Sequence, residues 1–200
     1  MKSFLRWIQF ALFAGAISLL GYCAFVVVDT WTFQNEERRQ FEQLPTDRPL
    51  APARAPSPPA ADSGVIGILD VPRLGLSVMV IEGVSKTTLR RAAGHIPGTA
   101  LPGQPGNVGI SAHRDTFFRP LRNIRQNDVI TVSTPLGEYR YRVVSTRIVS
   151  PSDVAVLDRS EEEILTLVTC YPFYFVGSAP KRFIVRAQRF GEKPIDVSAK

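Results

Sequence analysis

A cysteine, a histidine and an arginine, residue types that support nucleophilic catalysis, stand at the ends of predicted strands. The first of them is the cysteine. Cys170 closes the apolar run Ile164–Thr169 and is followed by Tyr171 and Pro172. Proline cannot donate to a strand ladder, so the chain should leave the sheet directly after the sulfur and open space above it. A thiol held there could act as a nucleophile. A buried structural cysteine is the alternative that stays open at this point.

A histidine and an arginine occupy similar positions. His113 ends the run Val108–Ala112, and Arg182 opens the run that leads to Phe190. An imidazole at a strand end could exchange protons with a thiol on a neighbouring strand end. A guanidinium there could stabilise an oxyanion above the sulfur, although a solvated surface arginine fits the same pattern. His95 lies in a loop rich in glycine and proline, which favours a turn or packing role.

The composition narrows the class of protein. Two cysteines exclude a disulfide framework, and two histidines leave little for a zinc site. The hydrophobic fraction of 44% is sufficient for a packed core. The net charge of +6 falls entirely in residues 64–200, where the basic residues are scattered. Scattered charge of this kind disfavours nucleic-acid binding. We find neither an internal repeat nor a glycine pattern for phosphate binding.

The N-terminal segment predicts a membrane anchor. Residues 7–28 are uncharged and, as a helix, long enough to cross the hydrocarbon core. Lys2 and Arg6 place residues 1–6 in the cytoplasm by the positive-inside rule. A cleaved signal peptide is the alternative, but the apolar run is long and no clean A-x-A site follows it. Cys23 is predicted to be a membrane residue, because Tyr22 stands where a lipoprotein would have a small residue.

Residues 29–63 are predicted to form an extracytoplasmic linker. Residues 30–41 mix aromatic and charged side chains and could extend the helix by a few turns. Six prolines then fall between Pro45 and Pro59, which favours an extended, semi-rigid spacer over a ligand for a proline-binding module. The catalytic domain is predicted at residues 64–192, with a C-terminal tail at 193–200.

Within residues 64–192 the pattern is that of an all-β domain. The runs that favour strands are 65–69, 76–81, 108–112, 129–133, 139–144, 164–169 and 183–190. The turn at residues 134–137 predicts a hairpin. Only residues 87–93, stopped by Gly94, favour a helix. Many short strands separated by turns indicate a sandwich or a closed barrel.

The sequence around the three candidate residues resembles the sortase family. The strings TLVTC, YPF and KRFIV surround the cysteine and the arginine, and NVGISAHRDTFF surrounds the histidine. The strings VIGILDVPRLGLSVMV and GHIPGTALPGQPGN are similar to the class D branch in particular. The resemblance covers about residues 65–190. One mild departure is the pair Ser111 and Ala112, where relatives often have glycine before the histidine.

The resemblance implies a membrane-anchored cysteine transpeptidase built on an eight-stranded β-barrel with short helical turns. By that likeness, Cys170 cleaves a C-terminal LPxTG-like sorting motif of a secreted protein through a thioacyl intermediate. Arg182 would stabilise the oxyanion, and His113 would protonate the leaving amine and deprotonate the incoming one. Thr169, Ala112 and Tyr171 would line the substrate groove.

The family likeness also implies partners and cofactors. The acyl group would pass to an amine in the cell envelope or on a pilin-like subunit, without nucleic acid. The enzyme would need neither a metal nor an organic cofactor. Some sortases bind calcium, but this sequence offers no set of ligands for it. The expected location is the cell membrane, as a single-pass protein with its catalytic domain outside the cytoplasm.

Three other classes of protein are alternatives to this interpretation. In papain-like proteases the cysteine precedes the histidine, whereas here His113 comes first. L,D-transpeptidases have a Ser-x-Gly-Cys context, which Cys170 lacks. A tethered barrel that binds an anionic envelope partner without catalysis is the third alternative, and it would tolerate loss of Cys170.

Overall fold

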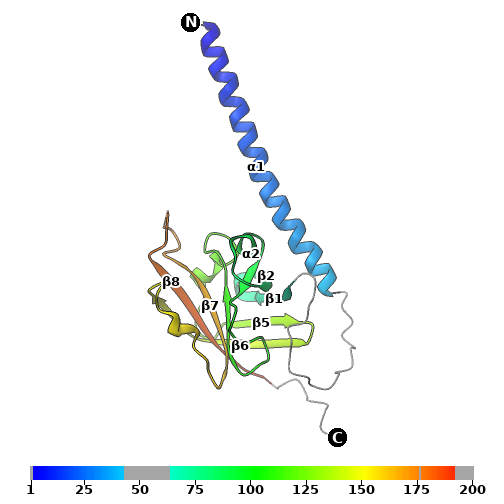
Figure 1. Ribbon diagram of the computed structural model, residues 1–200, viewed down its shortest axis with the longest axis vertical. Coiled ribbons are helices and arrows are strands. Elements are labelled where there is room, and N and C mark those ends of the chain that lie inside the picture. The colour runs from blue at the N-terminus through cyan, green and yellow to red at the C-terminus, as the bar shows by residue number, and fades with distance from the viewer. Residues whose placement is uncertain (1, 43–63, 176, 192–200) are drawn as a thin grey trace.

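The segment that carries the candidate residues is a closed barrel of eight strands in this computed structural model, which describes residues 2–42, 64–175 and 177–191 (Figure 1). Around the barrel the described strands follow the order β1-β2-β3-β4-β7-β8-β6-β5. Their bounds are β1 Val65–Val71, β2 Leu76–Glu82, β3 Ala93–His95, β4 Gly106–Ser111, β5 Val129–Thr134, β6 Gly137–Val149, β7 Glu163–Tyr171 and β8 Lys181–Arg189. The predicted all-β class and the eight-stranded barrel are therefore confirmed.

The apolar residues of the strands alternate so that one side of each fills the barrel. On β7, Leu165 and Leu167 are fully buried, and on β8 Val185 and Ala187 are fully buried as well. These positions belong to one core cluster to which all eight strands contribute, β3 through Ala93. Since neighbouring residues of a strand face opposite sides, the residues between them lie on the outer face.

Short helical turns join the strands. They are η1 Pro72–Leu74, α2 Lys86–Arg91, η2 Arg119–Asn123 and η3 Val154–Leu157. Ser85 caps α2, since its hydroxyl accepts a hydrogen bond from the backbone N–H of Thr88. The predicted hairpin is confirmed, because Thr134 pairs with Gly137 at the turn between β5 and β6.

The predicted helix at residues 87–93 is wrong at its end, where Ala93 begins β3. This three-residue strand pairs with β2 and β4 and was not foreseen. A Cβ at Gly94 would lie 2.2 Å from the carbonyl oxygen of Gly83. Glycine at this position therefore allows β3 to pack between its neighbours, instead of marking a helix stop.

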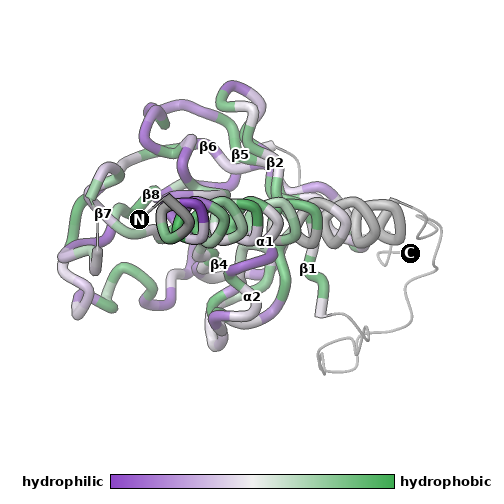
Figure 2. The backbone as a smooth tube through the Cα atoms, turned by 90° about the horizontal axis from the view of Figure 1, so that it is seen from above, coloured by the Kyte–Doolittle hydropathy of each residue, from purple (hydrophilic) through white to green (hydrophobic). Residues whose placement is uncertain are grey.

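The N-terminal helix α1 spans Lys2–Glu42 and projects beyond the barrel (Figure 1). Arg6–Phe25 is the one stretch of the described residues that is long and apolar enough to cross a membrane. Hydrophobic residues follow one another along α1 in Figure 2, and its described apolar side chains are exposed. The helix continues into the predicted linker as far as Glu42. The proline-rich remainder, residues 43–63, and the tail at 193–200 lie outside the described residues.

An ion pair joins the segment before β2 to the segment before β5. Asp128 is buried, and its carboxylate accepts hydrogen bonds from the Arg73 guanidinium and from the backbone N–H of Arg125. Arg73 also donates to the carbonyl of Asn123 in η2. The bonds from Arg73, and then the one from Arg125, hold the pKa of Asp128 below its usual value near 3.8.

This ion pair predicts a pH-dependent loss of stability in Asp128→Asn. A carboxyl whose pKa is lowered by folding stabilises the folded state above the unfolded pKa, and that stability disappears as the pH falls through the folded pKa. We expect the melting temperature of the variant to be lower by roughly 3–6 °C at pH 7, with the difference shrinking below about pH 4. Thermal unfolding followed by circular dichroism measures it. The exposed Asp158→Asn is the matched control, and a deficit that stays constant down to pH 2 would contradict the assignment.

Candidate active site

The three candidate residues lie in a row across the ends of three adjacent strands. In the antiparallel register of β7 and β8, Cys170 is the direct partner of Arg182. Residues opposite each other in such a pair have side chains on the same face, with their Cβ atoms about 5 Å apart. Strand pairing alone therefore places the thiol and the guanidinium side by side.

His113 approaches Cys170 from the other side. Strands β4 and β7 run parallel, and Ser111 pairs with Val168 at the end of β4. The chain continues along β7, since the N–H of Ala112 donates to the carbonyl of Val168 at 3.3 Å. Extending this register by two residues brings His113 beside Cys170. The chain then turns away through a hydrogen bond from the N–H of Phe118 to the carbonyl of His113.

The reactive side chains face outward and differ in exposure. Cys170 lies between the inward-facing positions Thr169 and Tyr171 of β7 and is partly buried. His113 is exposed, and Arg182 is partly buried. One terminal nitrogen of Arg182 donates to the carbonyls of Ala179 and Lys181, at 3.3 and 3.1 Å. These bonds hold the guanidinium at the strand end and leave its other N–H groups for a ligand.

Two of the residues assigned to the substrate groove are buried in this structure. Thr169 and Ala112 are 2% and 4% exposed, and the Thr169 hydroxyl donates to the Ala112 carbonyl at 2.8 Å. This bond fastens the end of β4 to β7, one residue away from both His113 and Cys170. A direct contact of either side chain with substrate stays a prediction, while their positioning of the strand ends is visible here.

Tyr171, the third residue assigned to the groove, belongs to an aromatic cluster at the mouth of the β7–β8 loop. Its ring stacks on Phe183 with centroids 6.4 Å apart and meets the edge of Phe173 at 6.1 Å. Phe173 and Phe183 contact each other at 5.3 Å. The cluster lies on the inward face of β7 and β8, where Phe173 and Phe183 pack against the barrel core.

Arg114 was not singled out from the sequence, but it organises the loop that follows the cysteine. Its side chain is 7% exposed and donates to the carbonyls of Pro172, Phe175 and Gly177 at 2.9, 2.6 and 3.1 Å. Because Arg114 directly follows His113, one residue connects the histidine's segment to the β7–β8 loop. In the sequence, Arg114 and the adjacent Asp115 have the pattern of a solvated charge pair, so no sequence signal indicates that Arg114 is buried.

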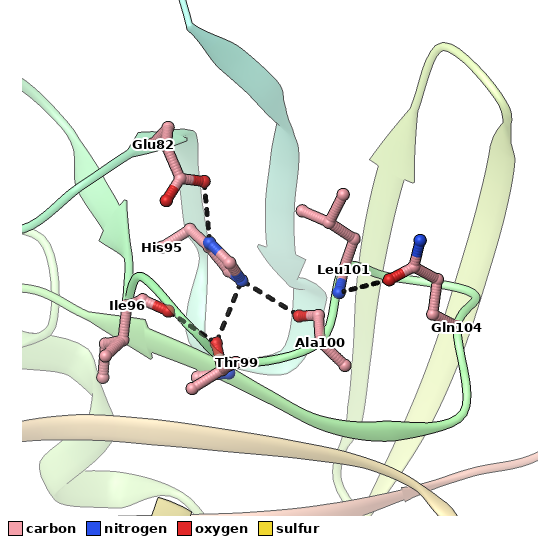
Figure 3. Close-up of polar contacts among 8 residues, drawn as sticks. Glu82, His95, Ile96, Thr99, Ala100, Leu101 and Gln104 are labelled. Atoms are coloured by element: carbon pink, nitrogen blue, oxygen red, sulfur yellow. Dashed lines mark hydrogen bonds and ion pairs between the residues drawn. The ribbon is translucent and has the colours of Figure 1, made fainter. Parts of the chain in front are cut away.

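His95 is a buried structural residue, as the sequence indicated. It is 3% exposed on β3, and its Nδ1 lies 2.8 Å from a carboxylate oxygen of Glu82 (Figure 3). Its Nε2 lies 2.9 Å from the carbonyl of Ala100 and 3.0 Å from the hydroxyl of Thr99 (Figure 3). Both ring nitrogens are occupied, so His95 has neither a free nitrogen nor the exposure that proton transfer requires.

The arrangement provides a nucleophile, an acid–base group and a cationic donor without a preformed metal site. Among the described residues, no group of three or more His, Cys, Asp or Glu side chains is placed to hold a metal ion. A thiol flanked by an imidazole and a guanidinium on an open strand end is suited to acyl transfer.

Comparisons with known proteins agree with this geometry. Residues 69–190 match the family model described as Sortase domain. The chain is 30% identical over 188 residues to Sortase D of Bacillus subtilis strain 168, which covers 88% of this chain and 94% of that relative.

Solved structures give the same picture. A Clostridium perfringens Sortase D5 transpeptidase has a TM-score of 0.58 at 30% identity, covering 64% of this chain and 79% of that one. Sortase C from Clostridium perfringens SM101 has a TM-score of 0.59 at 26% identity, covering 70% of this chain and 79% of that one.

Proposed function

Because this chain belongs to the sortase family, we propose that Cys170, His113 and Arg182 together carry out its transpeptidation. The chain is a cysteine transpeptidase of the kind that cleaves sorting motifs in protein substrates. The observation that supports the proposal most directly is the row formed by the three residues across β4, β7 and β8. A structural cysteine would need neither an exposed histidine nor a held guanidinium beside it.

In the first half of the reaction, the Cys170 thiolate attacks the carbonyl carbon of the scissile peptide bond and forms a C–S bond. The carbonyl electrons move onto oxygen, and the Arg182 guanidinium stabilises that charge through its free N–H groups. The C–N bond then breaks, and His113 gives its proton to the departing amine. The products of this half are a thioester on Cys170 and a free leaving peptide.

In the second half, an incoming amine attacks the thioester carbon. His113 accepts a proton from that amine, the C–S bond breaks, and the thiolate of Cys170 is regenerated. The side chain of His113 is exposed, which lets both amines reach it. Thr169 and Arg114 contribute by holding the strand ends and the β7–β8 loop in place.

The proposed acyl donor is a secreted protein with a C-terminal LPxTG-like sorting motif, and the proposed acceptor is an amine of the cell envelope or a pilin-like subunit. Residues 64–192 would be the catalytic domain, separated by the 29–63 linker from a single membrane span at residues 7–28. The apolar helix α1 supports membrane association.

This topology predicts that a reporter fused after Lys200 is exported. Lys2 and Arg6 flank the N-terminal side of the span, and the positive-inside rule places that side in the cytoplasm and the C-terminal part outside. Reporter activity on the outside, with the full-length chain retained in membranes, measures the outcome. A soluble, N-terminally trimmed protein as the main species would contradict the anchor.

The mechanism is tested by trapping the acyl-enzyme. The full chain in detergent is mixed with a library of LPxTG-like peptides, with and without triglycine as the amine acceptor. Intact-mass analysis should show a peptide adduct that triglycine removes as the transpeptidation product appears. Product formation without any adduct, under conditions that slow the second step, would contradict a thioacyl intermediate.

A further inference from the structure

The loop between β7 and β8 presents two aromatic side chains to solvent close to the candidate active site. Tyr174 and Phe175 are 78% and 43% exposed, and no other aromatic side chain of the barrel is exposed among the described residues 64–175 and 177–191. The loop begins directly after β7, two residues beyond Cys170. Adjacent exposed rings of this kind indicate a contact surface, because a barrel with its own core has no need of them.

The exposed rings are held outward by two guanidiniums. Arg114 donates to the carbonyls of Phe175 and Gly177, and its Cζ lies 5.9 Å from the centre of the Phe175 ring. The Cζ of Arg122, in η2, lies 5.6 Å from the centre of the Tyr174 ring. Contacts between a cation and the face of a ring favour one ring orientation. The loop and η2 therefore form one surface, with both rings at its edge.

The surface around these rings is basic. Residues 113–126 contain four arginines, and residues 171–182 contain one lysine and one arginine, which gives six basic residues against the single acid Asp115. Asp115 is paired with the arginine that precedes it. Arg119 and Arg122 are exposed and stand three residues apart in η2. Residues with that spacing lie on the same face of a 3-10 helix, so both charges point the same way.

The start of β7, at the other end of the strand from Cys170, has the opposite charge. Residues 158–163 contain four acids and one arginine. An anionic surface would attract the basic end of the barrel and repel the acidic one. The charge distribution therefore gives the barrel a preferred orientation at such a surface.

The chain itself supplies a bilayer for this surface to meet. Arg6–Phe25 is long and apolar enough to cross a membrane. In Figure 1 the β7–β8 loop stands at the upper edge of the barrel, and the membrane-length stretch of α1 extends above that edge. Tyrosine is enriched at the interface between water and the lipid tails, and basic side chains are attracted to anionic lipid headgroups. The loop and η2 present both kinds of side chain together.

We propose that the β7–β8 loop and the adjacent face of η2 dock on the anionic phospholipid surface of the membrane that holds α1. Tyr174 and Phe175 enter the interfacial region, and Arg119 and Arg122 lie at the level of the lipid phosphates. Because Cys170 stands two residues before the loop, docking holds the acyl-transfer site at the bilayer surface. The inference rests on the proposed membrane topology and adds an orientation of the barrel to it.

Depth-dependent fluorescence quenching tests the docking on the full chain. The chain carries one NBD fluorophore, attached in detergent, and is reconstituted into phosphatidylcholine nanodiscs with or without phosphatidylglycerol. The label sits on Cys23 in Cys170→Ala, or on Ser178→Cys or Leu136→Cys in a chain that lacks both native thiols. Ser178 is an exposed residue of the β7–β8 loop. Leu136 is the control, because it is 76% exposed but lies at the turn between β5 and β6.

The expected quenching differs among the three labels. With phosphatidylglycerol present, phospholipids that carry a spin label near the headgroup should quench the label at Ser178. Phospholipids with a spin label deep in the tails should instead quench the label at Cys23. The label at Leu136 should stay unquenched by both. In discs of phosphatidylcholine alone, the quenching at Ser178 should be much weaker.

Substitutions give the size of the effect, with the ratio of docked to undocked barrel read from the quenched fraction of the Ser178 label. Arg119→Gln and Arg122→Gln should each lower this ratio about fivefold, and the double variant about 25-fold. Tyr174→Ser should lower it as well, because it removes the ring that enters the interface. Arg159→Gln is the matched control, since Arg159 is the exposed arginine of the acidic segment, and it should leave the ratio unchanged.

The outcomes separate the docking from the anchor and from other ligands. Quenching at Cys23 without quenching at Ser178 would overturn the docking while the anchor stands. Quenching at Ser178 without quenching at Cys23 would contradict the anchor and still support the docking. Quenching at Ser178 that does not depend on phosphatidylglycerol, or that Leu136 shares, would overturn an oriented contact with anionic lipid. A Ser178 signal that responds to an LPxTG-like peptide and not to lipid would assign the rings to the protein substrate instead.

Discussion

Replacing Cys170 with alanine should abolish the acyl-enzyme and the transpeptidation product together in the full chain. The sulfur is the group that forms and releases the acyl bond, and no neighbouring side chain of the described site offers a second nucleophile of that strength. We expect kcat to fall by at least about 10⁴-fold, toward the background left by binding and oxyanion stabilisation. Intact-mass analysis and product formation are measured on the same samples.

The matched control for this variant is Cys23→Ala. Cys23 is the other free thiol of the chain and lies in α1, within the apolar stretch Arg6–Phe25. Its replacement should leave the adduct and the rate unchanged. An adduct that persists in Cys170→Ala, or that disappears in Cys23→Ala, would show that Cys170 is not the nucleophile. Transpeptidation at an ordinary rate without Cys170 would favour the non-catalytic binding barrel.

The strands that hold the site could be predicted because their local signals are strong. Apolar alternation located seven strands, and Pro172 correctly predicted that β7 ends right after the cysteine. Strand β3 was not predicted, because three residues are too few to show an alternating pattern and because a glycine such as Gly94 commonly marks the end of a helix. Its real role is close packing against the Gly83 carbonyl, which depends on a contact distant in sequence.

The convergence of the candidate residues depends on strand order, which local patterns do not contain. Cys170 and Arg182 lie on consecutive strands joined by the β7–β8 loop, so their pairing follows from an antiparallel connection between neighbours in the chain. The parallel neighbour β4 comes from more than fifty residues earlier, and only the family likeness implied that His113 would meet the thiol. The burial of Arg114 could not be inferred either, because its carbonyl partners belong to the β7–β8 loop.

Strand β6 gives a further reason why the simple alternation of faces along a strand can predict a side chain's direction wrongly. Arg142 and Arg147 are five residues apart, and in a regular strand they would point to opposite faces. The register of β6 shifts between Val143 and Ser145, so both arginines face outward, opposite Gln188 and Ile184. A bulge of this kind leaves no clear mark in the sequence, yet it brings Arg147 to the outer face of the barrel.

The two histidines should give opposite signatures when each is replaced by alanine. His113 is exposed and makes no side-chain bond among the described residues, so His113→Ala should leave the melting temperature nearly unchanged. Its loss removes the proton donor for the leaving amine and the acceptor for the incoming one. We therefore expect kcat to fall by about 10²–10⁴-fold, with partial recovery when imidazole is added to the assay.

His95→Ala should instead lower the melting temperature. At assay temperatures well below the variant's melting temperature, its kcat should be unchanged. The substitution leaves the partly buried Ala100 carbonyl without its side-chain partner and removes the hydrogen bonds of His95 with Glu82 and Thr99. Melting temperature and kcat are measured on both variants at the same pH. Equal losses of kcat, or recovery by imidazole in His95→Ala, would show that the proton-transfer role belongs to the buried residue. The exposure of His113 at the end of β4, beside the partner of Arg182, argues for the opposite outcome.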